Sequence, residues 1–322
     1  MAGPRDSEPA PTDRPRPAWA PPQLRGEALQ AGLRTLELEV RRRLDGLLQG
    51  NHLGLVPGPG SEPGEARAYQ AGDDVRRMDW AVTARTTEPH IRETVADREL
   101  ETWVALDLSP SVDFGTAACE KRDLVICALA AVTHLTRGGG NRIGAIVATG
   151  EHTVRIPARG GLAHARSLLR RVAELPSAPQ GTRGDLAALV ESLRRPPRRR
   201  GLVVIVSDFL GDTGWERALR GLSARHDLLA VEVLDPRDID LPDIGTAVLA
   251  DPESGDQREV TLTPLLRKEF AAAAAHHRAT VAKALRSAGA GHLVLRTDSD
   301  WIADMVRFVV ARKRLWSGGA GR

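Results

Sequence analysis

Two short stretches of the chain place oxygen-bearing side chains directly after apolar runs. The run WVAL is followed by Asp107, Ser109 and Ser111 at alternate positions, and the run GLVVIV is followed by Ser207 and Asp208. Alternate residues of an extended chain point to the same side, so the first three side chains are expected to share one rim. Carboxylate and hydroxyl oxygens without a nearby His or Cys favour a hard cation, and we predict Mg²⁺, with Ca²⁺ or Mn²⁺ as alternatives.

Each of these residues taken alone is equally well explained as a strand end or as a cap of the following helix. Only their joint pattern indicates a site. In open α/β sheets, ligands bind beyond the carboxyl ends of the strands, where the strand order reverses. The two polar strand ends therefore form one site if their strands are neighbours.

The elements that must position these residues alternate between strands and helices after residue 99. The apolar runs expected to be strands are 103–109, 142–148, 152–157, 201–208, 227–234, 245–251 and 292–296. The helical stretches between them are 119–137, 162–175, 184–195, 214–225 and 263–289. This alternation predicts a three-layer α/β/α fold with a mostly parallel sheet. The run 152–157 follows a short Gly150 turn and is expected to be an antiparallel edge strand, because a parallel partner needs a crossover.

The first hundred residues have a different character. Residues 1–24 are rich in Pro and lack an apolar core segment, which predicts a disordered tail and not a signal peptide. Apolar residues at spacings of three and four predict a helix within 25–50. Residues 51–98 mix Gly, Pro and charged residues without helical period and predict a small β-rich segment. A last amphipathic helix begins at 299 and a short tail ends the chain.

The composition limits the classes of partner and compartment. The formal net charge is only +3, and no apolar run reaches the roughly 18 residues of a membrane span. Cys119 and Cys127 are eight residues apart on one expected helix, about 12 Å along its axis, which is beyond the roughly 7 Å limit for a disulfide. We therefore expect a cytoplasmic protein without a membrane span.

The D-x-S-x-S pattern of residues 107–111 resembles the metal-ion-dependent adhesion site of von Willebrand factor A modules, and so does the Ser-Asp pair that ends the later strand. The resemblance implies a von Willebrand A-like, Rossmann-like module over residues 99–298. It also implies that Ser hydroxyls bind the ion directly, that carboxylates bind it directly or through water, and that a partner's carboxylate completes the coordination. A Thr ligand from a later loop is implied too, and Thr182 is the candidate, although Gly184 stands where that family has Thr.

A second resemblance covers more positions. Residues 67–93 are similar to the signature of the bacterial family called domain of unknown function 58, which carries a von Willebrand A-like module downstream. The matching positions are Arg67, Tyr69, Gly72, Asp73, Asp74, Arg76, Asp79, Trp80, Ala84, Arg85, Pro89 and Glu93. This resemblance implies a MoxR-type AAA+ ATPase as partner and a role in the assembly or activation of a client protein, which would offer the carboxylate. The candidate partner-binding residues are Asp73, Asp74, Arg76, Asp79, Trp80 and Arg85, and all of them are also explained as structural residues of a local fold.

The residue pattern favours a non-enzymatic interaction module. No Ser-His-Asp or Cys-His arrangement is indicated, and Ser109 stands where an aspartyl-nucleophile phosphohydrolase would have a second Asp. The basic run 194–200 lacks interleaved aromatic residues, so we expect no nucleic-acid partner. Metal-dependent hydrolysis and electrostatic nucleic-acid binding remain as the alternatives.

Overall fold

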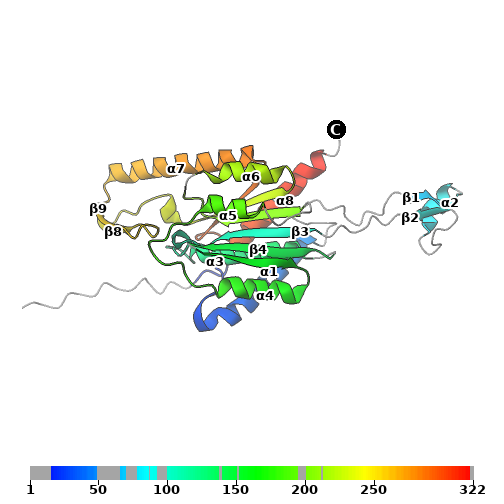
Figure 1. Ribbon diagram of the computed structural model, residues 1–322, viewed down its shortest axis with the longest axis horizontal. Helices are drawn as coiled ribbons and strands as arrows, with labels where there is room; N and C mark the ends of the chain where they lie inside the picture. Colours follow the sequence, from blue (N-terminus) through cyan, green and yellow to red (C-terminus); the bar gives the residue numbers. More distant parts are fainter. Residues whose placement is uncertain are drawn as a thin grey trace, which may run out of the picture.

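The computed structural model describes residues 16–48, 66–69, 78–86, 88–92, 100–137, 140–150, 152–194, 201–211 and 213–319. Its centre is a six-stranded sheet with the order β10-β7-β6-β3-β4-β5 (Figure 1). The strands are β3 (Glu101–Asp107), β4 (Arg142–Thr149), β5 (His152–Arg159), β6 (Gly201–Ser207), β7 (Asp227–Leu234) and β10 (Gly291–Arg296). Every neighbouring pair is parallel except β4 and β5. The predicted sheet with one antiparallel edge strand is confirmed.

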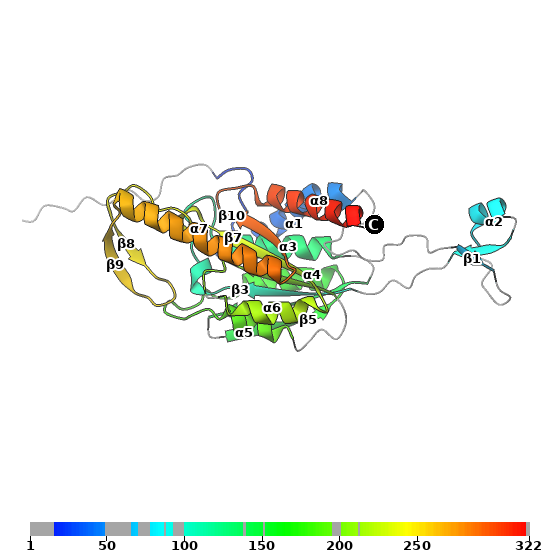
Figure 2. The same cartoon turned by 90° about the horizontal axis from the view of Figure 1, so that it is seen from above.

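Helices cover both faces of this sheet (Figures 1 and 2). One face carries α3 (Lys121–Leu135), α4 (Leu162–Ala173) and α8 (Trp301–Gly319), with α1 (Leu29–Leu48) packed against α3. The other face carries α5 (Leu186–Ser192), α6 (Trp215–Ser223) and α7 (Pro264–Ser287). Along β3, Val104 and Leu106 belong to the first hydrophobic cluster and Trp103 and Ala105 to the second. Alternate side chains of this strand thus pack into the hydrophobic clusters on its two faces, as a three-layer α/β/α fold requires.

Helix α3 is buried along its whole length, because α1 covers the side that faces away from the sheet. A capping box fixes its start: the Glu120 side chain accepts from the backbone of Asp123, and the Asp123 side chain accepts from the backbone of Glu120. Burial extends to the first turn, so that Lys121 lies inside the protein with 1% of its surface exposed. A cation in this place needs internal partners.

The run 245–251 is a strand, but it lies outside the main sheet. Strand β8 (Thr246–Ala250) pairs with β9 (Gln257–Thr261) in an antiparallel hairpin. Figure 2 shows this hairpin beside the start of α7. The expectation that 245–251 adds to the parallel sheet was wrong, since most of its side chains are exposed and have no second layer to pack against.

The N-terminal region is only partly described. Residues 1–15 and 51–65 lie outside the described residues, whereas Leu24, within the predicted disordered tail, is buried in the core at 1% exposure. Within the segment 25–50, for which the sequence predicts a helix, the structure has a short 3-10 turn, Gly26–Ala28, followed by α1. In the predicted β-rich segment, β1 (Ala66–Ala68) pairs antiparallel with β2 (His90–Arg92), and α2 (Trp80–Thr86) adds a helix that the sequence did not predict.

Two further expectations from the sequence concern membrane-spanning helices and a disulfide, and both can be examined in the described part of the chain. None of the helices there combines the length and the apolar character that crossing a membrane requires. Cys119 and Cys127 are separate buried thiols. Burial is the main cause that raises the pKa of both thiols, so neither has the character of a reactive thiolate.

Candidate functional site

The ends of β3 and β6 lie next to each other at the carboxyl edge of the sheet. Leu106 pairs with Val206 in parallel register, which makes the next residues along the two strands, Asp107 and Ser207, neighbours. The Ser207 hydroxyl donates a hydrogen bond of 2.8 Å to Asp107 Oδ2. This is also the point where the strand order reverses, because β4 lies on one side of β3 and β6 on the other. The candidate site therefore has the position where open α/β sheets bind ligands.

The two serines that follow β3 lie against each other beside Asp107. The backbone N–H of Ser109 donates to Asp107 Oδ1 at 3.0 Å, which turns the chain back toward the strand end. One turn of 3-10 helix, Pro110–Val112, then brings the Ser111 hydroxyl oxygen to 3.1 Å from that of Ser109. All three polar side chains are buried. The structure thus brings together the three residues that the alternating pattern singled out.

Asp208 joins the same group from β6. Burial, followed by the charge of the nearby Asp208 carboxylate, raises the pKa of the Asp107 carboxyl. The two oxygens of Asp208 have different partners: Oδ1 accepts from the backbone N–H of Leu210 at 3.3 Å, and Oδ2 is paired with Lys121 Nζ at 2.9 Å. The two carboxylates predicted to share one crevice therefore do so, but one of them is already paired with a cation of the protein.

Sequence analysis missed Lys121 and its second partner, Asp238. Lys121 Nζ lies 3.2 Å from the carboxylate of Asp238, which belongs to the 3-10 turn Pro236–Asp238. Burial by itself would lower the pKa of Lys121, but Asp208 and Asp238 outweigh it and the pKa is raised, so the ammonium stays charged. Nothing in the sequence pattern links these three residues, which come from three distant segments. The only local signal is a Lys in the first turn of a very apolar helix.

The loop before α5 reaches the site through Gly184 and not through Thr182. The Thr182 hydroxyl donates to the Pro179 carbonyl oxygen at 2.6 Å and lies against Gly150 in the β4–β5 turn. A Cβ placed on Gly184, in contrast, would stand 2.8 Å from Ser109 Cβ and 3.7 Å from Asp107 Oδ1. Thr182 is therefore not brought together with the other candidate ligands. Gly184, the position for which the resemblance implies a Thr, is close to the site but has no side chain.

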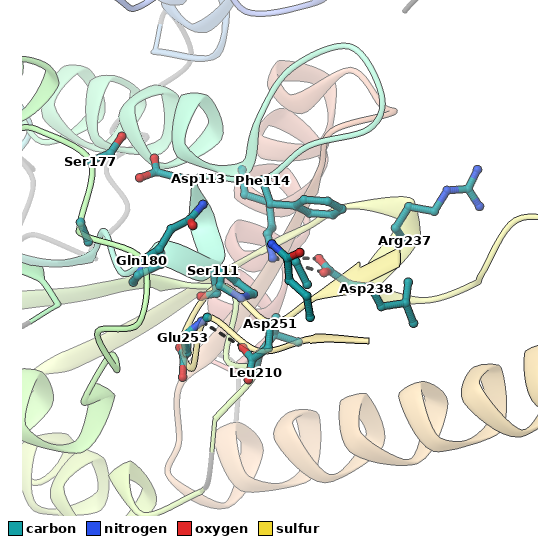
Figure 3. Close-up of a pocket in the computed structure, with 18 of the residues that line it drawn as sticks. Ser111, Asp113, Phe114, Ser177, Gln180, Leu210, Arg237, Asp238, Asp251 and Glu253 are labelled. Atoms are coloured by element: carbon teal, nitrogen blue, oxygen red, sulfur yellow. Dashed lines mark hydrogen bonds and ion pairs between the residues drawn. The ribbon is translucent and has the colours of Figure 1, made fainter. Parts of the chain in front are cut away.

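A cleft of about 870 Å³ opens beside these residues (Figure 3). Ser111, Lys121 and Asp238 contribute to its wall from the site. Phe114, Leu210, Val248 and Leu249 contribute large apolar side chains, each of them at least 39% exposed. The candidate site is therefore open to a partner on the side where apolar surface is available.

The β8–β9 hairpin adds a further carboxylate, that of Glu253, near the site. Its turn is held by Asp251, whose Oδ1 accepts from the backbone N–H of Glu253 at 2.9 Å, and the Pro252 carbonyl accepts from the N–H of Gly181 at 3.1 Å. Burial, then Asp208 and Asp107, raise the pKa of Glu253. Sequence analysis missed Glu253, because it assigned its segment to no element near the site.

The residues present fit a hard divalent cation. An octahedral Mg²⁺ with oxygen ligands at about 2.1 Å has adjacent ligands about 3.0 Å apart, and the hydroxyl oxygens of Ser109 and Ser111 are 3.1 Å apart. Within the described ranges, no three His, Cys, Asp or Glu side chains form a metal-binding group by themselves, so hydroxyl oxygens have to contribute. Asp107 and Asp208 contribute carboxylate oxygens, and Oδ2 of Asp208 is paired with Lys121.

The signature segment is described only in part. Asp73, Asp74 and Arg76 lie outside the described residues. Asp79 is buried at 8% exposure, and its Oδ1 accepts from the N–H of Val82 at 3.2 Å, so it caps the start of α2. Trp80 is 70% exposed and Arg85 is also exposed. Asp79 thus has a structural role, whereas Trp80 presents a large aromatic surface to solvent.

Similarity to known proteins extends over most of the chain. The family described as "Protein of unknown function DUF58" matches residues 65–280. Uncharacterized protein Rv1480 of Mycobacterium tuberculosis (strain ATCC 25618 / H37Rv) is 61% identical over 298 residues, which cover 91% of this chain and 94% of that protein. The family match includes both the signature segment and the two polar strand ends.

Two solved structures align with part of the chain at low identity. The conserved hypothetical protein BatB from Bacteroides thetaiotaomicron aligns with a TM-score of 0.39 and 14% identity, over 66% of this chain and 98% of that chain. A von Willebrand factor type A structure from Catenulispora acidiphila aligns with a TM-score of 0.32 and 13% identity, over 58% of this chain and 43% of that chain.

Proposed function

Because the chain belongs to the family described as protein of unknown function DUF58, we propose that it is a non-enzymatic module that binds a partner protein through a divalent cation. Mg²⁺ is the expected ion, with Ca²⁺ and Mn²⁺ as alternatives. The observation that carries the proposal is the convergence of Asp107, Ser109, Ser111 and Asp208 on one rim beside an open cleft. An oxygen-only donor set of this kind suits a hard cation.

Each residue of the rim has a distinct role in this proposal. The hydroxyls of Ser109 and Ser111 bind the ion directly, because their oxygens are 3.1 Å apart on the same rim. Asp107 and Asp208 act directly or through water, since both carboxylates already accept hydrogen bonds from the protein. The bound ion supplies a positive centre that attracts a partner's carboxylate, and the cleft provides room for the segment that carries it.

The proposed partners are a MoxR-type AAA+ ATPase and a client protein that is assembled or activated with its help. The resemblance of residues 67–93 to the family signature supports the first partner. The exposed indole of Trp80 and the exposed Arg85, five residues later on α2, would contribute to that interface. Tryptophan and arginine are the residue types that most often dominate interface energies.

Isothermal titration of the full chain with Mg²⁺ tests the ion-binding part of this proposal. We expect heat of binding for the wild type and a loss of at least tenfold in affinity for Asp107→Asn and for Ser111→Ala, because each removes an oxygen ligand or its charge. Asp227→Asn is the matched control, since Asp227 is exposed and starts β7 at the other edge of the sheet. A wild type without binding heat, or equal affinities in all four proteins, would refute Mg²⁺ binding at this rim.

Co-purification tests the partner part. The tagged protein is captured from the cytosol of its own source with Mg²⁺ or with a chelator, and the AAA+ ATPase and other proteins retained are identified by mass. We expect a client to be retained only with Mg²⁺, and its loss in Ser111→Ala. Retention of the same proteins with the chelator and in this variant would contradict a metal-dependent interaction.

A further inference from the structure

The ion pair between Lys121 and Asp208 is the feature of the site that the proposed function does not explain. The pair is 2.9 Å long and its side chains are 1% and 3% exposed. One oxygen of a predicted metal ligand is thus occupied by a cation that belongs to the protein. A divalent ion bound at the rim would be repelled by this ammonium, and it would compete with it for the same carboxylate.

The second partner of Lys121 makes such a competition feasible. Asp238 lies 3.2 Å from Lys121 Nζ, and its Oδ2 also accepts from the backbone N–H of Asp235 at 2.8 Å. If Asp208 turned toward a divalent ion, Lys121 would keep a buried anionic partner. A buried ammonium without any partner would be very unfavourable. Two carboxylates around one ammonium therefore allow one of them to be released.

We propose that Lys121 is an internal cation that occupies Asp208 in the absence of a divalent ion and lowers the affinity of the site for that ion. This inference rests on the proposed function, because it assigns the regulation of the same rim. Lys121 is a positioning residue in this role, since it acts through Asp208. Binding of the ion then requires Lys121 to be transferred from two carboxylates to Asp238 alone. Asp238 and Lys121 both line the cleft, so the transfer changes its wall next to the ion.

Two substitutions separate this role from that of an ordinary structural ion pair. Lys121→Met removes the competing charge and leaves two buried carboxylates, so we expect Mg²⁺ to bind about tenfold more tightly or better. Asp238→Asn leaves Lys121 with Asp208 as its only charged partner, so we expect Mg²⁺ to bind more weakly than in the wild type. A purely structural pair predicts lower stability in both variants and no opposite changes in affinity. Lys283→Met, on the exposed side of α7, is the control.

The measurements are isothermal titration with Mg²⁺ and thermal unfolding, the latter with and without Mg²⁺ at a concentration on the order of a few millimolar. We expect Mg²⁺ to raise the Tm of Lys121→Met far more than that of the wild type or of Lys283→Met. If Lys121→Met does not fold, the weaker binding of Asp238→Asn is the deciding result. Equal affinities in the wild type and in the foldable variants would overturn the inference but leave the proposed function standing. Absence of binding in the wild type, together with binding in Lys121→Met, would support the inference and refute the proposed function.

Discussion

The Ser207 hydroxyl donates a hydrogen bond of 2.8 Å to the Asp107 carboxylate, and the two residues are 100 positions apart in the chain. This bond joins the ends of β3 and β6 at the point where the strand order reverses. Because Asp107 is buried, its Oδ2 depends on this donor for its hydrogen bonding. The bond therefore connects the stability of the sheet edge with the geometry of the candidate site.

Ser207→Ala should lower the free energy of unfolding by about 1–3 kcal/mol, because it removes a donor from a buried carboxylate. Urea unfolding followed by circular dichroism measures this change. Ser223→Ala is the control, since its hydroxyl donates only to the Arg220 carbonyl at the exposed end of α6, and we expect a change within about 0.5 kcal/mol. Equal decreases in the free energy of unfolding of the two variants would mean that the hydrogen bond to Asp107 contributes no more to stability than an exposed one.

The loop before α5 provides a second prediction. Thr182→Val should leave the affinity for Mg²⁺ within about twofold of the wild type, because its hydroxyl is used by Pro179. Gly184→Ala should weaken binding by about tenfold, because the added Cβ would stand 2.8 Å from Ser109 Cβ and displace it. Titration of both variants with Mg²⁺ distinguishes them. The reverse order of effects would restore Thr182 as the ligand from this loop.

The stability of the protein should depend on pH through His134. Burial, its largest influence, lowers the pKa of His134 below the ordinary 6.5, although Nε2 lies 2.8 Å from Asp45 Oδ1. The unfolded chain then binds a proton more readily than the folded one. This contribution to stability is present above pH 6.5 and is lost as the pH falls through the folded pKa.

His134→Gln should therefore show a flatter decrease in the free energy of unfolding below pH 6.5 than the wild type. Urea unfolding at a series of pH values measures this slope. His152→Gln, at an exposed position of β5, is expected to follow the wild type. Parallel curves for the wild type and His134→Gln would show that His134 does not titrate in this range.

The N-terminal helix should be an integral part of the module. Leu44 of α1 is fully buried in the cluster that includes α3 and β3, whereas Leu38 on the same helix is 65% exposed. Leu44→Ala should cost about 2–5 kcal/mol of stability, and Leu38→Ala about 0.5 kcal/mol or less. Chemical unfolding that gives a single transition, shifted only by Leu44→Ala, would confirm that α1 and the sheet unfold together. Similar small effects would place α1 outside the core.

Trp80 should matter for the partner and not for the fold. Its side chain is 70% exposed, so Trp80→Ala should keep the Tm and the affinity for Mg²⁺. We expect retention of the AAA+ ATPase in the co-purification assay to fall at least tenfold, as for an aromatic interface anchor. Asp79→Ala is the contrasting variant, because loss of the cap of α2 should reduce order within this segment. Undiminished retention in Trp80→Ala would exclude it from the interface.

The alternation of strands and helices along the sequence determined the architecture, and the alternation of side chains at the end of β3 determined three of the site residues. A period of two in β3 fills two hydrophobic clusters, and the same period carries Asp107, Ser109 and Ser111 to one rim. Local periodicity decides these features, because the face on which a side chain lies depends only on the residues next to it. The family signature likewise was recognisable from residue types alone.

Tertiary structure decided which segments meet. Periodicity marked 245–251 as a strand, but only the packing of the whole chain placed it in a separate hairpin that brings Glu253 near the site. In the same way, Thr182 was chosen for its residue type, and the loop brought Gly184 to Ser109 instead.

Lys121 illustrates the physical reason most clearly. A Lys at the start of an apolar helix is expected to reach solvent, because a charge is costly to bury. Its burial is acceptable here because β6 and the turn after β7 bring Asp208 and Asp238 to its ammonium from 87 and 117 residues away. The sequence by itself determined most of the strands and helices and the oxygen-bearing side chains at the strand ends, whereas the ion pairs of Lys121 with Asp208 and Asp238 followed only from the folded arrangement.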